Sequence, residues 1–496
     1  MTLPIKDNDL VRTRWSSGDE KDYFKVFNPA TGAINKIVAG ASVTELNAAV
    51  AAAKKAFDLD WRHRTCQERA QYLLKAADAV AVHADELAEI LCSENGKTVQ
   101  DARMFDVEFC INVFRYFASL IVNEAGEFRQ QGSINATIIR EPFGVVGAIL
   151  PFNWPPIHTG GKLAPALATG NTLVMKPGDQ TPLTVMRIIE ILQDVFPPDV
   201  IHVVPAAGSA VPTALVEHPD VRKISFTGSP GGGVAVSKAG AATFTNLSLE
   251  LGGKNALLVF EDADMDRAVE DALEAGVFNK GEACTAGSRL VVHEKVHDAF
   301  VQRLSAAYEK IVSGDGTDNA THVGPQVSAV QQKRVLEYIE LGQKEGATVA
   351  AQGSLPSDPS LKNGFFVTPT LFTDVKPQMR IAKEEIFGPV QVVLKFSTYD
   401  EAIQIVNGTD FGLVCGIYTQ DSALQWRATR DVDAGMVLVN NYFRAVLGTP
   451  FGGVKGSGQA REHCEETLRE FTWAKNIRVP SGIGKVPQWR AIKDCF

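Results

Sequence analysis

Several features that would indicate a membrane, secreted or nucleic-acid-binding protein are missing from this chain. No run of eighteen apolar residues could span a bilayer, and residues 1–9 lack the basic and apolar regions of a secretory signal. The chain has no basic tract, and its formal net charge of −9 argues against a phosphate-rich partner. We therefore expect a soluble protein with neither a nucleic-acid nor a membrane partner.

Cysteine is also scarce. The seven cysteines form no CxxC pair and no dense framework, a distribution typical of free thiols in a reducing compartment. This pattern predicts a cytoplasmic location, and we expect no metal site. Six of the cysteines lie in amphipathic or terminal contexts that favour buried packing: Cys66, Cys92, Cys110, Cys415, Cys464 and Cys495.

Length and apolar content predict two or three domains. A chain of 496 residues is too long for one hydrophobic core, and 45% of its residues are hydrophobic, enough to fill several cores. Ser42 and Glu45 form a capping-box pattern ahead of apolar residues at helical spacing, so a helix is predicted to begin there. Further helix is predicted to about Ser119.

The pattern changes at Gly144 to short apolar runs separated by segments of helical length. The predicted strands are residues 145–150, 172–176, 200–204, 223–227 and 256–260. The predicted helices between them are residues 184–196, 210–217 and 233–239. A second set of strands is predicted further along, at residues 289–292, 390–396, 412–419 and 436–440. This alternation predicts two parallel sheets with helices on both faces and ligands at the carboxyl ends of the strands.

Two segments fit neither sheet. Residues 121–140 alternate apolar and polar side chains in places, and the chain from Phe471 onward is equally irregular. We interpret them as a projecting β-arm and a tail that pairs across subunits. Residues 354–363 are predicted to form an exposed loop.

Cys284 is the cysteine whose surroundings indicate chemistry. It lies among glycine and small residues, after an amphipathic stretch and before an apolar run, and thirty-four residues after Glu250. A substrate carbon can reach a loop cysteine of this kind, whereas it cannot reach a cysteine in a core. The two residues would provide a thiol nucleophile and a carboxylate base.

Other motifs are ambiguous when each is taken alone. Asn153 closes a predicted strand and could donate to an oxyanion, but an asparagine before proline is commonly a turn former. Lys176 and Asp179 end the next strand and could bind a ribose, or could simply be solvated. The turn 226–233 has glycines that would admit a phosphate to a helix N-terminus, although it does not match GxGxxG.

The order and spacing of these motifs resemble the NAD(P)-dependent aldehyde dehydrogenase superfamily over residues 26–479. The most specific matches are segments 249–255, 281–289, 384–389 and 450–458. The resemblance implies oxidation of a small aldehyde to a carboxylic acid, with NAD as hydride acceptor and a cysteine thioester as intermediate. It implies that Cys284 is the nucleophile, Glu250 the base and Asn153 the oxyanion donor.

The resemblance also implies binding residues. The implied cofactor residues are Lys176, Asp179, Gly228, Ser229, Gly233, Glu385 and Phe387. The implied substrate-pocket residues are Trp154, His158, Phe278, Tyr442 and Arg444. NAD-preferring members usually carry a longer glutamate at the position of Asp179, so NADP stays open as a cofactor. The usual glycine is also missing from segment 459–462.

The implied fold is α/β, with two doubly wound parallel-sheet domains and a small β-arm for oligomerisation. Residues 1–120 and 142–253 would form a Rossmann-like NAD-binding domain, and residues 254–470 a catalytic domain. Residues 121–141 and 471–496 would form the arm and tail of a homodimer or homotetramer.

Three alternatives remain at this point. Arg444 leaves open a semialdehyde substrate with a distal carboxylate. A thiol hydrolase or acyltransferase would pair Cys284 with a histidine, but none of the nine histidines lies in a motif of its own. A non-catalytic protein on the same fold is disfavoured because Cys284, Glu250 and Asn153 are all present.

Overall fold

The computed structural model describes residues 10–16 and 22–488, so Cys495 and the end of the predicted tail lie outside the described residues. The chain begins with a three-stranded sheet of β1 (Leu10–Val11), β3 (Ile34–Ala39) and β2 (Tyr23–Phe27). The predicted capping box is confirmed at the start of α1 (Val43–Leu59). The Ser42 side chain accepts a hydrogen bond from Glu45 N at 3.2 Å, and the Glu45 carboxylate accepts one from Ser42 N at 2.8 Å.

Helices follow to residue 121, close to the predicted limit. They are η3 (Trp61–His63), α2 (Cys66–Val82), α3 (Ala84–Asn95), α4 (Val99–Asp101), the π-helical η4 (Ala102–Val107) and α5 (Glu108–Ile121). No helix among the described residues is both long enough and apolar enough to cross a bilayer.

The first parallel sheet has the strand order β10-β9-β6-β7-β8. Its strands are β6 (Val145–Ile149), β7 (Thr172–Lys176), β8 (Ile201–Val203), β9 (Val221–Thr227) and β10 (Asn246–Glu250). The connecting helices are α6 (Pro155–Ala168), α7 (Pro182–Gln193), α8 (Ala210–Glu217) and α9 (Pro230–Ala241). The sequence predicted every one of these elements except α6 and β10. The strand predicted at residues 256–260 in this first set lies instead in the second sheet, as β11 (Ala256–Val259).

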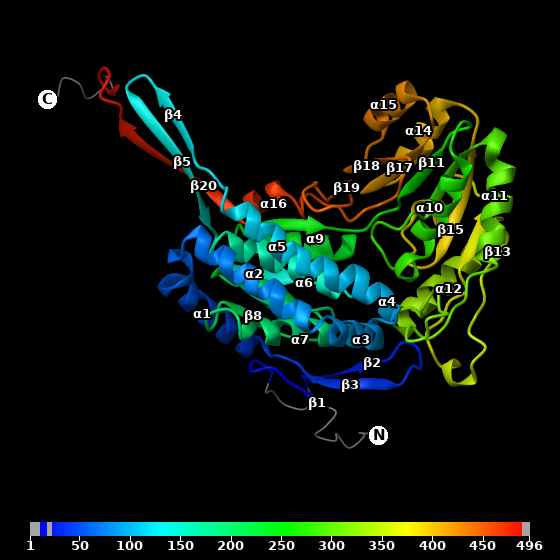
Figure 1. Ribbon diagram of the computed structural model, residues 1–496, viewed down its shortest axis with the longest axis horizontal. Helices are drawn as coiled ribbons and strands as arrows, with labels where there is room; N and C mark the ends of the chain where they lie inside the picture. Colours follow the sequence, from blue (N-terminus) through cyan, green and yellow to red (C-terminus); the bar gives the residue numbers. More distant parts are fainter. Residues whose placement is uncertain (1–9, 17–21, 489–496) are drawn as a thin grey trace.

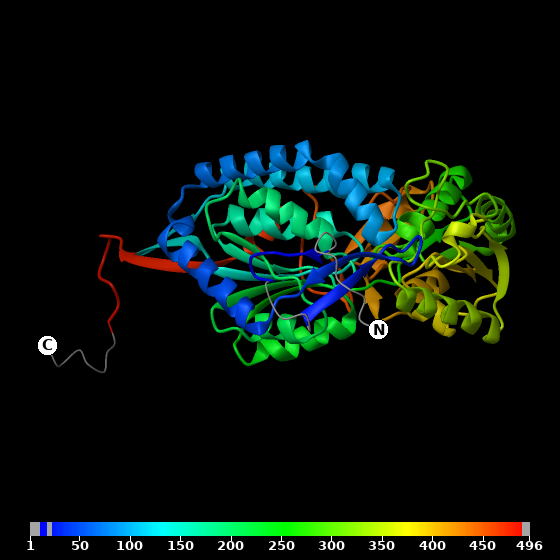
Figure 2. The same ribbon diagram turned by 90° about the horizontal axis from the view of Figure 1, so that it is seen from below.

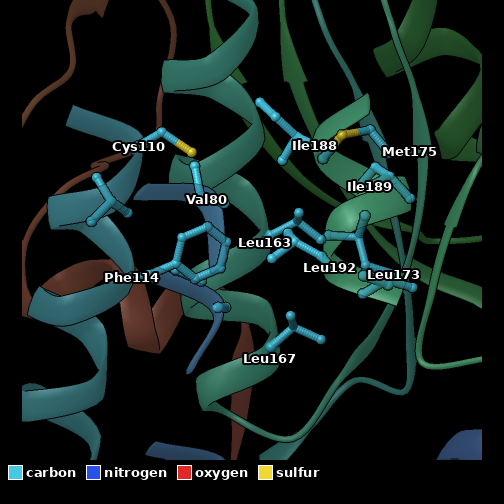
Figure 3. Packing of buried hydrophobic residues seen from close by; sticks show 14 of the residues in the cluster. Val80, Cys110, Phe114, Leu163, Leu167, Leu173, Met175, Ile188, Ile189 and Leu192 are labelled. Carbon is cyan, nitrogen blue, oxygen red and sulfur yellow. The ribbon is translucent and has the colours of Figure 1, made fainter. Parts of the chain in front are cut away.

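Alternate residues of each strand pack on opposite faces of this sheet, as strand geometry requires. Leu173 and Met175 of β7 join the core beneath α2, α5, α6 and α7 (Figure 3), whereas Val174 joins a second core with α1, α8 and α9. Figure 2 shows helices on both sides of the strands. Because both faces are covered, β6 and the centre of β7 are apolar runs, which is why the sequence reveals them.

The second sheet has the order β13-β14-β15-β12-β11-β17-β18, parallel except for its edge strand β13. Its strands are β11 (Ala256–Val259), β12 (Arg289–His293), β13 (Thr348–Gln352), β14 (Thr370–Thr373), β15 (Val390–Phe396), β17 (Val414–Tyr418) and β18 (Met436–Val439). Its helices are α10 (Met265–Val277), α11 (Glu294–Tyr308), α12 (Ala329–Lys344), α13 (Arg380–Lys383), α14 (Tyr399–Asn407) and α15 (Ser422–Asp431).

The strand predicted at residues 412–419 is divided in two. Gly412 belongs to β16 (Phe411–Gly412), which pairs with β19 (Val454–Lys455), and β17 begins at Val414. The division arises because Gly412 N donates to the Ser457 hydroxyl, at 3.0 Å, instead of to the large sheet. The predicted fold class, α/β with two parallel sheets, is confirmed.

A separate antiparallel sheet projects from the body (Figure 1). It contains β4 (Glu127–Gln131), β5 (Ile134–Pro142) and β20 (Thr472–Pro480), and β20 directly follows α16 (Glu465–Glu470) in the chain. The tail strand β20 pairs along its whole length with β5 of the same chain. The loop predicted at residues 354–363 contains one short turn of helix, η6 (Pro359–Leu361).

Candidate active site

The carboxyl edge of the first sheet faces the amino edge of the second. Asn153 follows β6, Gly228 follows β9 and Glu250 is the last residue of β10, whereas Cys284 precedes β12 and Glu385 precedes β15. A cavity of about 720 Å³ lies between the two edges. From the predicted site it is lined by Asn153, Gly228, Ser229, Cys284, Glu385 and Phe387.

A strained turn delivers Cys284 to this cavity. Asn279, Lys280 and Gly281 have φ angles of 50°, 63° and 70°, so three successive residues are left-handed. Such a run is costly for residues with a Cβ and persists only where surrounding contacts enforce it. Downstream, the Asn255 side chain donates to the Cys284 carbonyl at 2.8 Å and to the Ala286 carbonyl at 2.9 Å.

Cys284 is a half-buried free cysteine held as a thiol. Burial raises its pKa to about 12, and the nearby charges of Glu250 and Glu385 act in the same direction. The other half-buried cysteine of the described residues, Cys66, lies at the start of α2. The predicted buried packing agrees with the burial of Cys92, Cys110, Cys415 and Cys464, whereas Cys66, for which the same was predicted, is half-buried.

Glu250 is buried, and neither of its carboxylate oxygens has a hydrogen-bond partner among the described residues. Burial raises its pKa well above the usual value, and the negative charge of Glu462 adds to this effect. Although burial opposes ionisation of Glu462 as well, the Lys162 ammonium, 2.8 Å away, holds the pKa of Glu462 below its usual range. The arrangement therefore places a protonatable carboxyl group beside a fixed ion pair.

Asn153 lines the cavity, and its side-chain amide makes no hydrogen bond with the described residues. Its side chain is buried, its Oδ1 has no partner, and its NH2 makes no hydrogen bond within the part of the chain that the structure describes. The backbone of Asn153 is by contrast firmly held, because its carbonyl accepts hydrogen bonds from Lys97 and Asn279 at 3.1 Å each. A fixed backbone with a free amide is what an oxyanion donor requires.

The predicted phosphate and ribose residues occupy the first-sheet side. Ser229 caps α9 by accepting from Gly232 N at 3.2 Å, so the helix N-terminus opens into the cavity. Lys176 and Asp179 form an ion pair, and Asp179 also accepts from Gly208 N at 2.9 Å. Lys176, Asp179 and Gly233 do not line the cavity. A Cβ at Gly233 would meet Leu251 at 2.8 Å, so this glycine serves close packing.

The second-sheet side carries Glu385 and Phe387. Glu385 accepts from Gly253 N at 2.9 Å, and burial raises its pKa to about 7. Phe387 is left-handed at φ 63°, and its ring meets Phe152 edge-on with centroids 5.7 Å apart. Phe152 and Phe387 thus border the cavity from the loops of opposite sheets.

Aromatic rings cluster beyond Asn153. The Trp154 and Phe278 ring centroids are 5.3 Å apart, and Phe105 of the π-helical segment lies 4.8 Å from Phe278. His158 is buried with both ring nitrogens unpartnered, and burial lowers its pKa to about 3, so it stays neutral. The predicted substrate residues Trp154 and Phe278 thus belong to this aromatic cluster, and neither they nor His158 line the cavity.

Tyr442 and Arg444, both predicted to line the substrate pocket, contact protein groups outside the cavity. The Tyr442 hydroxyl donates to the Thr285 carbonyl at 3.1 Å, so it supports the residue after Cys284. Arg444 pairs with Glu274 at 2.7 Å and donates to the Tyr442 carbonyl at 3.1 Å. Neither side chain lines the cavity.

Helix α12 contributes residues to the cavity that the sequence did not predict. Gln331, Arg334 and Tyr338 line the cavity, and Gln331 donates to the Phe387 carbonyl at 2.6 Å while Arg334 donates to the Glu385 carbonyl at 2.7 Å. These residues lie on an ordinary amphipathic helix, and no motif distinguishes them. Among the described residues no group of three or more His, Cys, Asp or Glu side chains is placed to hold a metal ion.

Comparison with known proteins gives a consistent result. Residues 15–477 match the model of the aldehyde dehydrogenase family. Aldehyde dehydrogenase citD of Monascus ruber is 53% identical over 97% of this chain and 96% of its own. An aldehyde dehydrogenase of Didymella fabae is 52% identical, with 97% of each chain covered. A Bacillus cereus aldehyde dehydrogenase solved as its NAD+ complex has a TM-score of 0.90 and 38% identity, covering 92% of this chain and 93% of that one.

Proposed function

The chain belongs to the aldehyde dehydrogenase family, and we propose that Cys284, Glu250 and Asn153 carry out its reaction. The observation that supports this assignment best is the cavity between the two sheets. Cys284 and the unpartnered amide of Asn153 both line it, and Glu250 ends the adjoining strand β10. A nucleophile, an oxyanion donor and a base therefore come together from three distant segments.

The protein is an NAD-dependent aldehyde dehydrogenase, as the sequence predicted. The residues around the cavity fit this cofactor. Ser229 opens a helix N-terminus suited to a pyrophosphate, and the carboxylate of Glu385 and the ring of Phe387 are suited to a ribose and a nicotinamide. When bound, NAD supplies the hydride acceptor.

The residues of this chain perform the remaining steps. Cys284 passes its proton to the Glu250 carboxylate, which releases it to solvent before the hydrolytic step. The Cys284 sulfur bonds to the aldehyde carbon, while the carbonyl π electrons move to oxygen. The Asn153 amide and the backbone N–H of Cys284 stabilise that oxyanion. Collapse of the oxyanion expels the hydride and leaves a thioester on Cys284. Glu250 then removes a proton from water, the hydroxide adds to the thioester, and the acid leaves as the C–S bond breaks.

The raised pKa values of Glu250 and Cys284 indicate which of these groups hold a proton before the reaction. A buried, unpaired carboxyl group such as Glu250 can accept a proton near neutral pH, which an ordinary exposed carboxylate does poorly. Cys284 starts as a thiol, so its ionisation is an energetic cost that binding of substrate and cofactor must offset.

We propose an uncharged apolar or aromatic aldehyde as the substrate. The support is the cluster of Trp154, Phe278 and Phe105 beyond Asn153. The semialdehyde alternative required Arg444 to meet a distal carboxylate, and this guanidinium already pairs with Glu274. We also propose that Lys176 and Asp179 meet the ribose and favour NAD over NADP, since a carboxylate there repels a 2′-phosphate.

We also propose a domain organisation, an oligomeric state and a cellular location. Residues 1–120 and 142–253 would form the NAD-binding domain, 254–470 the catalytic domain, and 121–141 with 471–496 the oligomerisation arm. The projecting sheet of β4, β5 and β20 supports such an arm, and thereby a homodimer or homotetramer. Cysteine usage supports a cytoplasmic location.

Replacement of the nucleophile tests the proposal. Cys284→Ser should bind NAD normally but lose dehydrogenase activity by a factor on the order of 1,000 or more, because an alcohol is far less ionised than a thiol. Cys66→Ser is the matched control, since Cys66 is also free and half-buried but lies far from the cavity in α2. A Cys284→Ser activity within about tenfold of the parent would remove the nucleophile assignment.

A further inference from the structure

The backbone carbonyl of Asn153 is held by two buried side chains from distant segments. Lys97 Nζ and Asn279 Nδ2 each donate to it at 3.1 Å. Lys97 is fixed in turn by both carboxylate oxygens of Asp106, at 2.8 and 2.9 Å. Lys97 and Asp106 are at most 1% exposed, so neither group has water as an alternative partner.

The preceding carbonyl is held in the same way. Phe152 O accepts from Asn95 Nδ2 at 2.9 Å and from the Thr181 hydroxyl at 3.2 Å. Lys280 donates to the side-chain oxygen of Asn95 at 2.7 Å, which turns the Asn95 NH2 toward Phe152. Both carbonyls that flank the Asn153 Cα therefore accept two side-chain hydrogen bonds, the full number of their lone pairs.

Asn279 connects this support to the nucleophile. The NH2 group that donates to Asn153 O also donates to Glu282 O at 2.9 Å, two residues before Cys284. Asn279 is left-handed at φ 50° and buried, so the backbone aims its amide at these two carbonyls. One side chain thereby spans the loop of the oxyanion donor and the loop of the nucleophile.

We infer that Asn279 and Lys97 are positioning residues, which act through Asn153 by fixing its amide relative to the Cys284 sulfur. The inference rests on the proposed role of Asn153 as oxyanion donor. Stabilisation of an oxyanion depends on the donor lying within a few tenths of an ångström of the developing charge. A buried amide and a buried ammonium that both bind the backbone of the donor supply this constraint. Neither residue lines the cavity, so neither is a catalytic residue.

A double-mutant cycle separates positioning from a general structural role. Asn279→Gly keeps the left-handed backbone without strain and removes the amide. In the parent it should slow hydride transfer in the first turnover by about 10- to 100-fold, since loss of a whole oxyanion donor costs about 100- to 1,000-fold. In an Asn153→Ala background the same change should cost no more than about twofold, because the group that it positions is gone.

Two measurements accompany the rate. The dissociation constant for NAD and the rate of alkylation of Cys284 by iodoacetamide should stay within about twofold of the parent. Equal losses from Asn279→Gly in both backgrounds, or no loss in the parent, would overturn the inference. If Asn153→Ala itself left the hydride step unchanged, the proposed oxyanion donor would fail instead, and the two failures are thus distinguishable.

A second variant covers the case in which Asn279→Gly fails to fold. Lys97→Met with Asp106→Asn removes the ammonium without leaving a buried carboxylate unpaired, and it should show the same dependence on Asn153. Arg69→Met is the matched control, because Arg69 is a buried cation that donates to a backbone carbonyl, Ala168 O at 2.7 Å, away from the site. Its hydride-transfer rate should equal that of the parent. An equal loss in Arg69→Met would show that any buried cation matters and would overturn the inference.

Discussion

At the scale of single residues, the site is dominated by burial of ionisable groups. Burial is the largest cause of the raised pKa values of Cys284, Glu250 and Glu385. Ionisation of each group is therefore unfavourable in this cavity, and it occurs only when a neighbouring charge or a ligand offsets the cost of burying the charge. This makes the reactivity of Cys284 strongly dependent on pH.

The first prediction concerns that dependence. Since burial raises the pKa of Cys284 to about 12, only a small thiolate fraction exists near neutral pH. Alkylation of the cofactor-free protein by iodoacetamide should rise about tenfold per pH unit between about pH 6 and 10, without a plateau. Glu250→Gln should react faster at the alkaline end, because one negative charge that raises the pKa is removed. A plateau near neutral pH would show that the thiolate is already stabilised.

The second prediction concerns Arg444. Because its guanidinium pairs with Glu274, Arg444→Ala should reduce kcat/KM equally for a semialdehyde and for an alkanal of the same length, and Glu274→Gln should behave alike. The loss should be modest, about 1 kcal/mol, as for other partly exposed ion pairs. A selective loss of about 2 to 5 kcal/mol on the semialdehyde would instead show that Arg444 binds a substrate carboxylate.

At the scale of elements, the sequence predicts best those strands that are buried on both faces of a sheet, because they form continuous apolar runs. The apolar runs identified most strands of both sheets, and the motifs placed Asn153 at the end of β6 and Cys284 in a loop before β12, where both line the cavity. Strand β10 was missed because Asn246–Glu250 lacks the continuous apolar run that identified its neighbours: Leu249 is in a core, but Ser248 is bonded to Lys223 and Glu470.

Residues that act through backbone contacts were also not predictable. Lys97 and Arg334 hold carbonyls of distant segments, and such contacts leave no local pattern in the chain. The π-helical turn η4, which carries Phe105 toward Phe278, likewise lies within a sequence of ordinary helical character. Motifs identify reacting groups, whereas the groups that orient them depend on tertiary structure.

The third prediction tests the turn before Cys284. Gly281 has φ 70°, and a Cβ there would meet the carbonyl of Gly388 at 2.2 Å. Gly281→Ala should therefore destabilise the protein by at least about 3 kcal/mol and abolish activity. Gly346→Ala is the control, because Gly346 has φ 94° with nothing within 4 Å, and it should cost only about 1 kcal/mol. Equal shifts in the urea unfolding midpoint would show that the contact with Gly388 is unimportant.

At the scale of the whole molecule, the two large sheets face each other and the antiparallel sheet of β4, β5 and β20 projects away from them. The cavity exists only because the two large sheets face each other, so neither sheet alone contains the site. The projecting sheet exposes large apolar residues, with Phe128 66% and Val479 48% exposed. Apolar side chains on a projecting sheet are typical of surfaces that are covered on assembly.

The fourth prediction follows from this exposure. Phe128→Ser with Val479→Ser should lower the molar mass measured by light scattering, toward that of one chain, by weakening assembly through the arm. Trp426→Ser is the control, since Trp426 is 73% exposed on α15, away from the arm. Assembly that is unaffected by the arm variant, or equally affected by the control, would contradict a role for the arm.

The central claim is that a thioester forms on Cys284 and that Glu250 is needed to hydrolyse it. The most direct measurement is to mix Glu250→Gln with NAD and an aldehyde, quench in acid, and determine the mass of the peptide that contains Cys284. The account predicts a rapid burst of about one NADH per chain and an acyl group on that peptide. Steady NADH production at the parent's rate, with Cys284 unmodified, would contradict it.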